Sequence, residues 1–376
     1  MGGDVWRLLQ HVRFPFCSRG FFADVVEPDV LMTGPECAGY VAECRKYHAT
    51  AAEERRPEVG ADDNKRLVPR DGMKVILVTG GFSNEGEVYG VWRYRHGLNA
   101  CEPITTLPLR CAFISACAFA TRLFVTGGQA SSGQIVADTW SFCVRTQSWQ
   151  RHARMCHARM LHSTAVVGGR LYAVGGQGNG SDVTQPADTR DNEVIPDDVE
   201  LVSAEEYDAD ADEWRPLPDM LKAVKRPAVA SFSGCMWVIG GSVDSMGVRS
   251  TDVVQVYDPT SGQWSYGTPL PEPLFCPGAV VVTDNRLYVY GGQRHTVYRY
   301  EPRQQLWRAL AVASQGHMEG GCVYWQGKLL LLGGKSDAGR TDIVEAYDVH
   351  NDSWSRCECP LPKSLSSHTV ALVKSC

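Results

Sequence analysis

The sequence lacks the long apolar segment that a membrane-spanning helix needs. No apolar run approaches 18 residues anywhere in the 376-residue chain. A secretory signal peptide is also missing, and the 14 cysteines are scattered, mostly within apolar runs, rather than spaced as a disulfide framework. We therefore expect a cytoplasmic protein of a reducing compartment, with free thiols and no membrane partner.

A positive net charge is absent as well. The chain carries 37 Lys and Arg residues against 43 Asp and Glu residues, which gives a formal net charge of −6. Because nucleic acids are polyanions, this balance argues against non-specific binding to DNA or RNA. We predict no nucleic-acid partner.

Motifs of the common enzyme classes are missing too. The chain contains no GxSxG, HExxH or P-loop sequence, and the glycines of GGQGNGS follow a strand-like run into a loop without matching GxGxxG. His152, Cys156, His157 and His162 are close in sequence, but their spacing fits no standard zinc site. We therefore predict no enzymatic activity, no cofactor and no metal.

What the sequence does contain is one pattern repeated six times. Each copy has an apolar run that ends in a glycine pair, then a polar loop, an aromatic residue, and a further anchor seven residues later. The glycine pairs are Gly80-Gly81, Gly127-Gly128, Gly175-Gly176, Gly240-Gly241, Gly291-Gly292 and Gly333-Gly334. The aromatic residues and anchors are Tyr94 and Cys101, Phe142 and Trp149, Tyr207 and Trp214, Tyr257 and Trp264, Tyr300 and Trp307, and Tyr347 and Trp354.

The spacing within the repeat separates a rigid part from a variable loop. From an anchor to the second glycine of the next pair is 27 residues in four of five cases and 28 in the other, whereas glycine to aromatic varies from 8 to 31. Apolar runs without alternation indicate strands that are buried on both faces, as in sheets packed around an axis. The glycine pairs suit the end where such strands converge, since a Cβ would collide there and φ can be positive.

The anchors are expected on the outer strands, where they fill the wider gap between neighbouring sheets. Burial of a tryptophan contributes roughly 2–3 kcal/mol to stability. Cys101 is a small residue at a tryptophan position. We therefore expect the first sheet to pack less well than the others.

The glycine-pair, tyrosine and tryptophan spacing resembles the kelch repeat, with a period of about 50 residues. The resemblance covers residues 73–376 and implies a mainly β fold, a six-bladed kelch β-propeller. The C-terminal run HTVALV (368–373) is expected to serve as the innermost-but-one strand of blade 1, closing the ring without an open edge. Propeller enzymes such as galactose oxidase share the repeat, but their copper site of tyrosines and histidines has no matching group here, so an enzyme is the minor alternative.

Residues 1–50 do not follow the propeller pattern. In PECAGYVAECRKYHA, Pro35 suits the first turn of a helix, and apolar residues recur at helical spacing from Cys37 to Tyr47. With the preceding VRFPF, this segment resembles the C-terminal part of the BACK domain of kelch-like proteins. Residues 51–72 are charged and nearly free of large apolar groups, which predicts an exposed linker.

No BTB domain is recognisable in the chain, and the first half of the BACK module is absent. In the kelch-like family these parts dimerise and bind the cullin-3 scaffold. The resemblance therefore implies cullin-3 as a partner only if a longer form of this protein carries a BTB domain.

Two sets of loops are expected to form one face of the propeller. The loops between glycine pair and aromatic emerge at the same rim as the connections from each blade to the next; we call this rim the loop face. Family members bind partner peptides there, so the resemblance implies a protein or peptide partner. The candidate contact residues are Ser83, Asn84, Arg110, Arg159, Arg226, Arg294, His295 and Arg340. Arginine suits carboxylate or phosphate recognition, although each residue taken alone is more typical of an ordinary solvent-facing loop.

The longest of these loops, residues 178–203, is strongly acidic. From Gly178 through Glu206 there are nine acidic residues and one basic residue, and the flanking connections 151–160 and 222–226 are basic. One hypothesis is that the loop competes with an acidic partner; the alternative, which charge runs favour, is a solvated loop. Cys156 near Arg154, His157 and Arg159 similarly suggests either a redox-sensing thiol of lowered pKa or an ordinary loop thiol.

The sequence leaves two functions as alternatives. The first is the substrate-recognition part of a cullin-3 RING E3 ubiquitin ligase adaptor. The alternative is a stand-alone kelch scaffold, for instance on the cytoskeleton, without a link to ubiquitin. The partner itself is not specified, because propeller loops diverge and a fold does not determine function.

Overall fold

The structure is a computed structural model that describes residues 41–42, 74–95, 100–179, 198–244, 249–281, 286–291 and 295–374. The chain divides into two compact units, Met1–Met73 and Lys74–Cys376. In the first unit only Val41 and Ala42 are described; both are helical and Val41 is buried. The rest of the predicted BACK-like segment and the predicted linker 51–72 lie outside the described residues.

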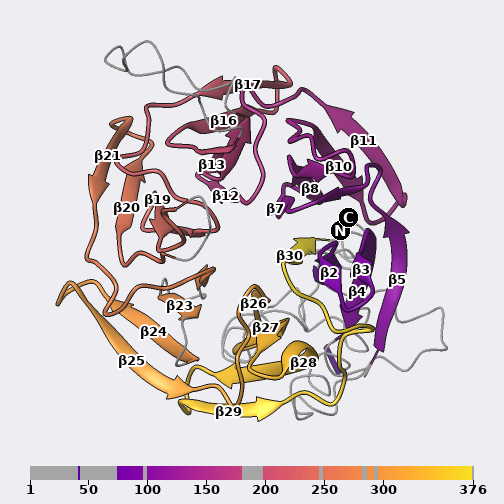
Figure 1. Cartoon of the computed structure of the whole chain (residues 1–376). Coiled ribbons are helices and arrows are strands. Elements are labelled where there is room, and N and C mark those ends of the chain that lie inside the picture. Colours follow the sequence, from indigo (N-terminus) through magenta and orange to yellow (C-terminus); the bar gives the residue numbers. More distant parts are fainter. Residues whose placement is uncertain are drawn as a thin grey trace, which may run out of the picture. The chain divides into compact units, whose positions relative to one another are not determined.

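The second unit consists of six four-stranded antiparallel sheets around a central axis (Figure 1), as the kelch pattern predicts. From the axis outward, blade 1 contains β30 (Thr369–Lys374), β1 (Lys74–Thr79), β4 (Gly90–Arg95) and β5 (Ala100–Thr106). Blade 2 contains β7 (Ser115–Phe119), β8 (Arg122–Thr126), β10 (Thr139–Cys143) and β11 (Ser148–His152). Blade 3 contains β12 (Ser163–Val167), β13 (Arg170–Val174), β16 (Ala204–Asp208) and β17 (Glu213–Pro216).

The other three blades follow the same order. Blade 4 contains β18 (Ala228–Phe232), β19 (Cys235–Ile239), β20 (Val254–Asp258) and β21 (Gln263–Tyr266). Blade 5 contains β22 (Gly278–Val281), β23 (Leu287–Gly291), β24 (Thr296–Glu301) and β25 (Leu306–Val312). Blade 6 contains β26 (Gly321–Trp325), β27 (Lys328–Ser336), β28 (Gly339–Asp348) and β29 (Ser353–Arg356). Three two-stranded sheets join β2 (Phe82–Ser83) to β3 (Gly86–Glu87), β6 (Cys111–Ala112) to β9 (Gln129–Ala130), and β14 (Gln177–Asn179) to β15 (Asp198–Glu200).

The glycine pairs follow directly after the second strand in blades 1 to 4, whereas in blade 6 Gly333 and Gly334 lie inside β27. Neighbouring backbones approach closely at these glycines. Gly127 has φ +57°, and a Cβ at this position would lie 2.2 Å from the carbonyl oxygen of Arg159. At Gly176, φ is +92° and a Cβ would lie 2.4 Å from the carbonyl oxygen of Met160. Both the left-handed backbone and the missing space exclude other residues, because only glycine lacks a Cβ.

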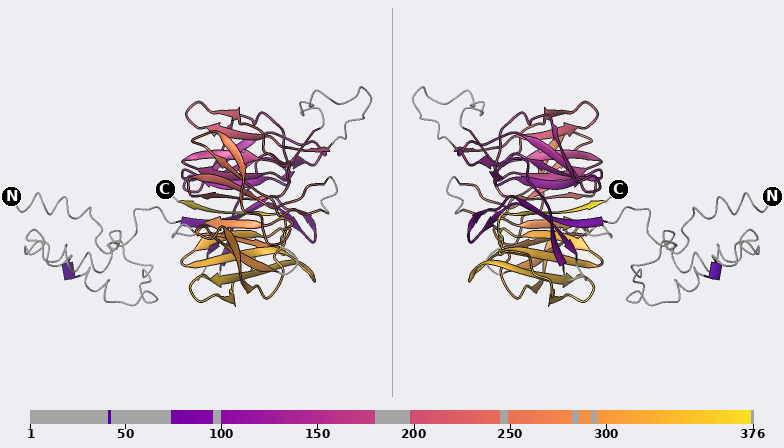
Figure 2. Two further views of the ribbon diagram at one scale, coloured as in Figure 1. Left: turned by 90° about the vertical axis from the view of Figure 1, so that its left-hand side faces the viewer. Right: turned by 90° about the vertical axis from the view of Figure 1, so that its right-hand side faces the viewer.

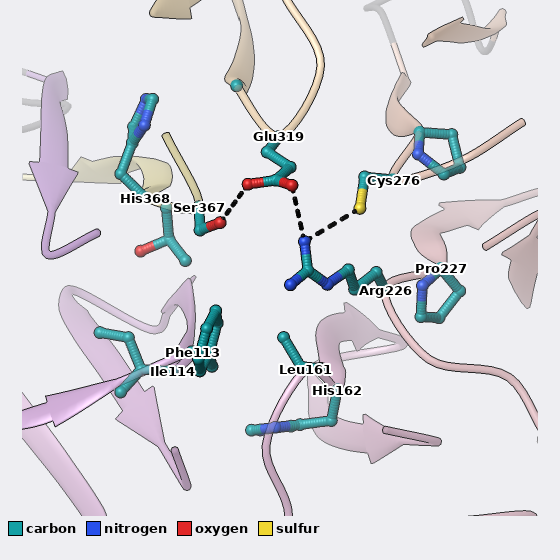
Figure 3. A pocket seen from close by; sticks show the side chains of 13 residues that line it. Phe113, Ile114, Leu161, His162, Arg226, Pro227, Cys276, Glu319, Ser367 and His368 are labelled. Carbon is teal, nitrogen blue, oxygen red and sulfur yellow. Dashed lines mark hydrogen bonds and ion pairs between the residues drawn. The ribbon is translucent and has the colours of Figure 1, made fainter. Parts of the chain in front are cut away.

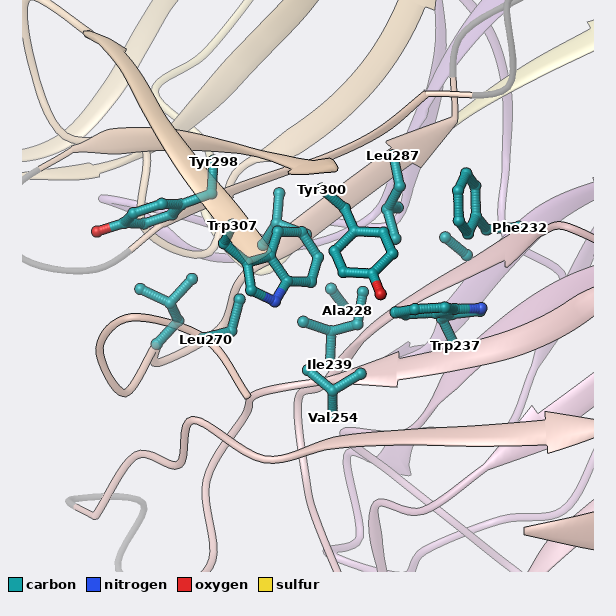
Figure 4. Packing of buried hydrophobic residues seen from close by; sticks show 13 residues of the cluster. Ala228, Phe232, Trp237, Ile239, Val254, Leu270, Leu287, Tyr298, Tyr300 and Trp307 are labelled. Carbon is teal, nitrogen blue, oxygen red and sulfur yellow. The ribbon is translucent and has the colours of Figure 1, made fainter. Parts of the chain in front are cut away.

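The tryptophan anchors lie on the outer strands, as predicted. Tyr257 on β20 and Trp264 on β21 are cross-strand partners, with ring centroids 5.2 Å apart. The Nε1 of Trp264 donates a hydrogen bond of 2.8 Å to the carbonyl of Pro218, in the connection from blade 3. Trp307 likewise donates to the carbonyl of Thr268 at 3.0 Å and packs in the core shared by blades 4 and 5 (Figure 4). Each such tryptophan therefore joins its blade to the preceding one.

Blade 1 replaces this arrangement with a contact to blade 6. Cys101 is the cross-strand partner of Tyr94. The Tyr94 hydroxyl donates a 2.8 Å hydrogen bond to the carbonyl of Cys359, and Tyr94 is buried. Cys101 and Cys357 pack against the core that blades 1 and 6 share. The weaker packing expected for blade 1 stays a prediction.

The ring is closed by β30, which pairs with β1 over six residues from Lys74–Lys374 to Thr79–Thr369. The strand occupies the innermost position of blade 1, not the innermost-but-one position that we expected. The reason is that the strand whose apolar run leads into the glycine pair is second from the axis, so β1 takes that place. The two paired strands come from opposite ends of the unit.

Candidate partner-binding face

The loop face is defined by the strand order of the blades. In an antiparallel four-stranded sheet, the connection from second to third strand and the exit to the next blade leave at the same rim. The strands run from one rim of the ring to the other, as the side views in Figure 2 show. The turns between first and second and between third and fourth strands therefore lie on the opposite face.

At the loop face, one residue from each connection lies two positions before the innermost strand of the next blade. All six have a positive φ, between 45° and 59°. These residues, which we call the axial ring, are Phe113, Leu161, Arg226, Cys276, Glu319 and Ser367. A left-handed backbone costs non-glycine residues about 1–3 kcal/mol each, and it persists only where the surroundings impose it.

Backbone hydrogen bonds between neighbouring members hold the axial ring in place. The amide of Leu161 donates to the carbonyl of Phe113 at 3.1 Å, and the amide of Arg226 donates to the carbonyl of Leu161 at 2.7 Å. Across the seam between blades 6 and 1, the amide of Ser367 donates to the carbonyl of Glu319 at 2.8 Å. These bonds join the backbones of three neighbouring pairs in the axial ring.

The axial ring lines a pocket of about 140 Å³ on the propeller axis (Figure 3). Nη1 of Arg226 donates to Oε1 of Glu319 at 2.9 Å and approaches the sulfur of Cys276 at 3.5 Å. Glu319 also accepts hydrogen bonds from Ser367 and from Lys335. The ionic side of the pocket is therefore a connected network rather than a free charge.

Glu319 is ionised within this network. Burial alone would raise the pKa of its carboxyl, but Arg226, Ser367 and Lys335 outweigh burial and lower that pKa below its usual value. The guanidinium of Arg226 also lies 5.5 Å from the ring centroid of Phe113 and 5.7 Å from that of Phe275. Arg226 is thus held by a carboxylate and by two aromatic rings.

Arg159, predicted as a partner-contacting residue, is a structural residue instead. Its side chain is fully buried and its guanidinium pairs with the equally buried carboxylate of Glu205. Nη1 of Arg159 donates to the carbonyls of Gly175 at 2.9 Å and Ser203 at 3.1 Å. A side chain with no exposed surface cannot contact a partner on this face, so that interpretation is corrected.

The other predicted contact residues are spread around the rim. Ser83 is buried and stabilises the β2–β3 turn through Gly86, whereas Asn84 at the tip of that turn is exposed. Arg110 is exposed, with its guanidinium 5.9 Å from the ring centroid of Tyr89. His295 and Arg340 are half-buried, and Nε of Arg340 donates to Ser366 at 3.0 Å. Arg294 lies outside the described residues, and Arg226 is the one candidate that the described part of the chain places in the pocket.

Sequence reasoning missed the other five residues of the axial ring. A signal for them exists, because Phe113, Leu161, Arg226 and Glu319 each lie 14 residues before the first glycine of the following pair, and Cys276 lies 15 before it. Their side chains are chemically unlike one another, so residue type does not reveal the set.

The structure also changes the interpretation of Cys156. Burial and the Glu205 carboxylate raise the pKa of its thiol to about 11, more than the Arg159 charge lowers it. The redox-sensing alternative required a lowered pKa, which this shift contradicts, so the other alternative, an ordinary loop thiol, is the one that remains.

The neighbouring histidines make separate contacts: His152 with Tyr207, His157 with Glu205, and His162 with Thr126. Across the described residues, no three His, Cys, Asp or Glu side chains are grouped to hold a metal ion.

Two further observations concern only the described part of the chain. It holds no helix with the length and apolarity to cross a bilayer. Most of the acidic loop, residues 180–197, falls outside it, so the hypothesis that this loop competes with an acidic partner stays a prediction.

Comparison with known families agrees with this geometry. The model of the family described as Kelch motif matches residues 110–155, 223–271, 274–311 and 319–360. The chain is a kelch-repeat protein. Kelch-like protein 35 of Mus musculus is 30% identical over 383 residues, covering 99% of this chain and 61% of that protein. Its Homo sapiens counterpart is 31% identical over 380 residues, covering 99% of this chain and 60% of that protein.

A shorter alignment links this kelch-repeat protein to Kelch-like protein 23 of Homo sapiens, 30% identical over 254 residues, with 67% of this chain and 42% of that protein covered. The chain therefore spans between 42% and 61% of the length of these relatives. Among solved structures, YjhT superposes with a TM-score of 0.58 at 17% identity, covering 77% of this chain and 99% of that one. This likeness supports the fold alone.

Proposed function

We propose that this kelch propeller binds a protein partner through its loop face and acts without enzymatic activity of its own. The observation that carries the proposal is the axial ring: six side chains, one from each connection between blades, surround a pocket at that face. A concave site with apolar walls and a few fixed polar groups is typical of a ligand-binding site. Asn84, Arg110 and Arg340 lie on the loop face around it and supply polar contacts for a partner larger than the pocket.

We further propose that the whole protein works in the cytoplasm as the substrate-recognition part of a cullin-3 RING E3 ubiquitin ligase adaptor. Similarity to kelch-like proteins supports this role. The alternative is a kelch scaffold that binds proteins, for instance on the cytoskeleton, without ubiquitin transfer. The two differ in one observation, namely whether the transcript's 5′ end encodes a BTB domain.

Affinity purification from cells, followed by mass spectrometry, tests the binding face. The bait is the full chain, compared with the double variant Asn84→Arg/Arg110→Glu on the loop face and with Arg303→Glu. Arg303 is an exposed residue in the turn between β24 and β25, on the opposite face. We expect the loop-face variant to lose partners that the Arg303 variant retains. Equal retention by both variants, or loss only with Arg303→Glu, would contradict the proposal.

The ligase role needs a separate measurement. A longer form that encodes a BTB domain should co-purify cullin-3, and the partner's ubiquitination should fall when the loop-face variant replaces the wild-type chain. Partner binding without recovered cullin-3 from such a form would favour the scaffold.

A further inference from the structure

The polar side of the axial pocket carries more positive than negative charge. Arg226 and Lys335 both donate to Oε1 of Glu319, each at 2.9 Å, and Ser367 donates to Oε2 of the same carboxylate. Two cations therefore share one carboxylate, and one positive charge in this group is left without an opposite charge.

Lys335 allows Arg226 to bind a ligand without leaving Glu319 unpaired. The Glu319 side chain is only 6% exposed, and it keeps Lys335 and Ser367 as donors whatever else Arg226 contacts. A guanidinium has five N–H donors, and the described hydrogen bonds of Arg226 use only those on Nη1. Its centre lies between Glu319 and Phe113, 5.5 Å from the Phe113 ring centroid (Figure 3). The donors on Nε and Nη2 are thus left for a group in the pocket.

Two histidines among the lining residues add buried polar atoms without a partner. Nδ1 of His162 and Nδ1 of His368 make no hydrogen bond within the described part of the chain. Burial lowers the pKa of these side chains to about 3 and about 4, so both imidazoles are neutral at pH 7. Because buried polar atoms without a partner are destabilising, a ligand that brings polar atoms to these residues is favoured over a purely apolar one.

The unmatched charge selects a group with a single negative charge. One carboxylate neutralises the positive charge that Arg226 and Lys335 leave over, and its two oxygens match the geometry of a guanidinium. A phosphate monoester carries roughly −1.5 to −2 charges at pH 7 and would leave negative charge beside Glu319. A neutral group would leave the positive charge unpaired. The charges of the pocket therefore favour a carboxylate.

A side-chain carboxylate suits this pocket better than the carboxylate of a chain end. The pocket has a volume of about 140 Å³, and Phe113, Ile114 and Leu161 form its apolar side. A chain end would bring its last backbone amide into this space, where the N–H and C=O groups would need partners. A Glu side chain brings only its carboxylate and methylene groups, and the methylene groups can pack on Phe113 and Leu161.

We propose that Arg226 in the axial pocket binds the side-chain carboxylate of one Glu or Asp residue in a linear segment of the partner. This inference rests on the proposed function and names the group that the loop face selects. Arg340, which donates to Ser366 next to the axial ring, places a further cation near the bound segment.

A random peptide library displayed on phage and selected on the full chain provides the test. Each peptide is fused to the coat protein through its C-terminus, so that only side chains can present a carboxylate. We expect the enriched peptides to share one Glu or Asp position. Replacing that residue by the matching amide, Gln or Asn, in a synthetic peptide should weaken binding to the wild-type chain by about tenfold or more in fluorescence polarisation. This measurement does not depend on any protein variant being folded.

Two matched variants then place the carboxylate on Arg226. Arg226→Gln removes the guanidinium, while Glu319 keeps Lys335 and Ser367 as donors. The acidic peptide and its amide counterpart should bind this variant within about twofold of each other, because the interaction in which they differ is gone. Arg303→Gln removes an exposed arginine of the opposite face and should preserve the difference seen with the wild-type chain. Thermal melts of both variants check that they remain folded.

The outcomes separate this inference from the proposed function. Enriched peptides that require an apolar residue and no acidic one would overturn the inference, and so would an acidic peptide that binds Arg226→Gln as tightly as the wild-type chain. A library without any enriched peptide, or tighter binding once phosphoserine replaces the acidic residue, would also overturn it. The proposed function would be decided independently by the comparison of loop-face and Arg303 variants.

Discussion

Replacing Arg159 by methionine should destabilise the propeller strongly, although the residue touches no partner. Methionine keeps much of the apolar volume but removes the charge that compensates Glu205. Both side chains of this pair are fully buried, and removal of one partner from a buried ion pair costs about 3–5 kcal/mol. The backbone amides of Cys156 and His157 also donate hydrogen bonds to Glu205, and these remain in the variant. We therefore expect a loss of stability nearer 3 than 5 kcal/mol, on the order of the lower limit for a broken buried pair.

The control is the ion pair of Glu206, the residue after Glu205 on β16. Arg170 pairs with Glu206 on β16, but the Arg170 side chain is 66% exposed. Exposed ion pairs contribute little to folding stability, so Arg170→Met should leave the melting temperature nearly unchanged. The assay is chemical denaturation of the full chain followed by tryptophan fluorescence, with a thermal melt alongside.

The pH dependence gives the prediction a second readout. Burial would raise the pKa of Glu205, but hydrogen bonds from His157 and the Arg159 charge lower it to about 2 in the folded protein. This lowered pKa stabilises the wild-type fold above about pH 4.5 and the contribution is lost as pH falls toward 2. Without Arg159, burial raises the pKa of Glu205, so its carboxylate becomes protonated at a higher pH and no longer carries an uncompensated charge. The loss of stability relative to the wild-type chain should therefore be smaller at pH 4 than at pH 7.

A double variant completes the test. Glu205→Gln in the Arg159→Met background removes the uncompensated charge and should recover a measurable part of the lost stability. The reasoning would be refuted if Arg159→Met were no more destabilising than Arg170→Met, or if its deficit were the same at pH 7 and pH 4.

Three further predictions concern the frame of the propeller. Burial lowers the pKa of His162 to about 3 and of His368 to about 4. Since these side chains protonate near pH 6.5 in the unfolded chain, each should lower the free energy of unfolding by about 2 kcal/mol between pH 7 and pH 5. The double variant with asparagine at both positions should therefore show a smaller difference in denaturation midpoint between these pH values. Gly127→Ala should lower stability by more than about 2 kcal/mol, and by clearly more than the control Gly168→Ala. Both glycines have φ +57°, but only Gly127 has atoms within 4 Å of the added Cβ. Equal melting temperatures of the two variants would contradict this. Removing residues 363–376 deletes β30 and leaves β1 without its inner partner, so cooperative unfolding should be lost in calorimetry, and a normal melt would show that closure does not depend on this strand.

The frame was predictable because its constraints repeat. Gly127 and Gly176 each occur where a backbone carbonyl leaves no room for a Cβ, and Trp264 spans the gap to the preceding blade; geometry imposes the same residue type in successive blades. The spacing of these residues was therefore enough to predict six blades.

The site was less predictable because its residues share a backbone position and no chemistry. Phe113, Cys276 and Glu319 occupy equivalent left-handed positions, so no residue type marks them. Arg159 was misassigned because its partner, Glu205, lies 46 residues away along the chain, and a sequence does not show which arginine meets a buried carboxylate. The placement of β30 was misjudged by one strand, since the order of strands from the axis is a property of packing.

The central claim is that the loop face is where this kelch propeller meets its partner, and site-specific photo-crosslinking in cells tests it most directly. A benzophenone amino acid is placed at Asn84 on the loop face or at Arg303 on the opposite face, both of which are exposed. The account predicts a discrete crosslinked partner from position 84 and none from position 303. A partner captured only from position 303 would contradict it.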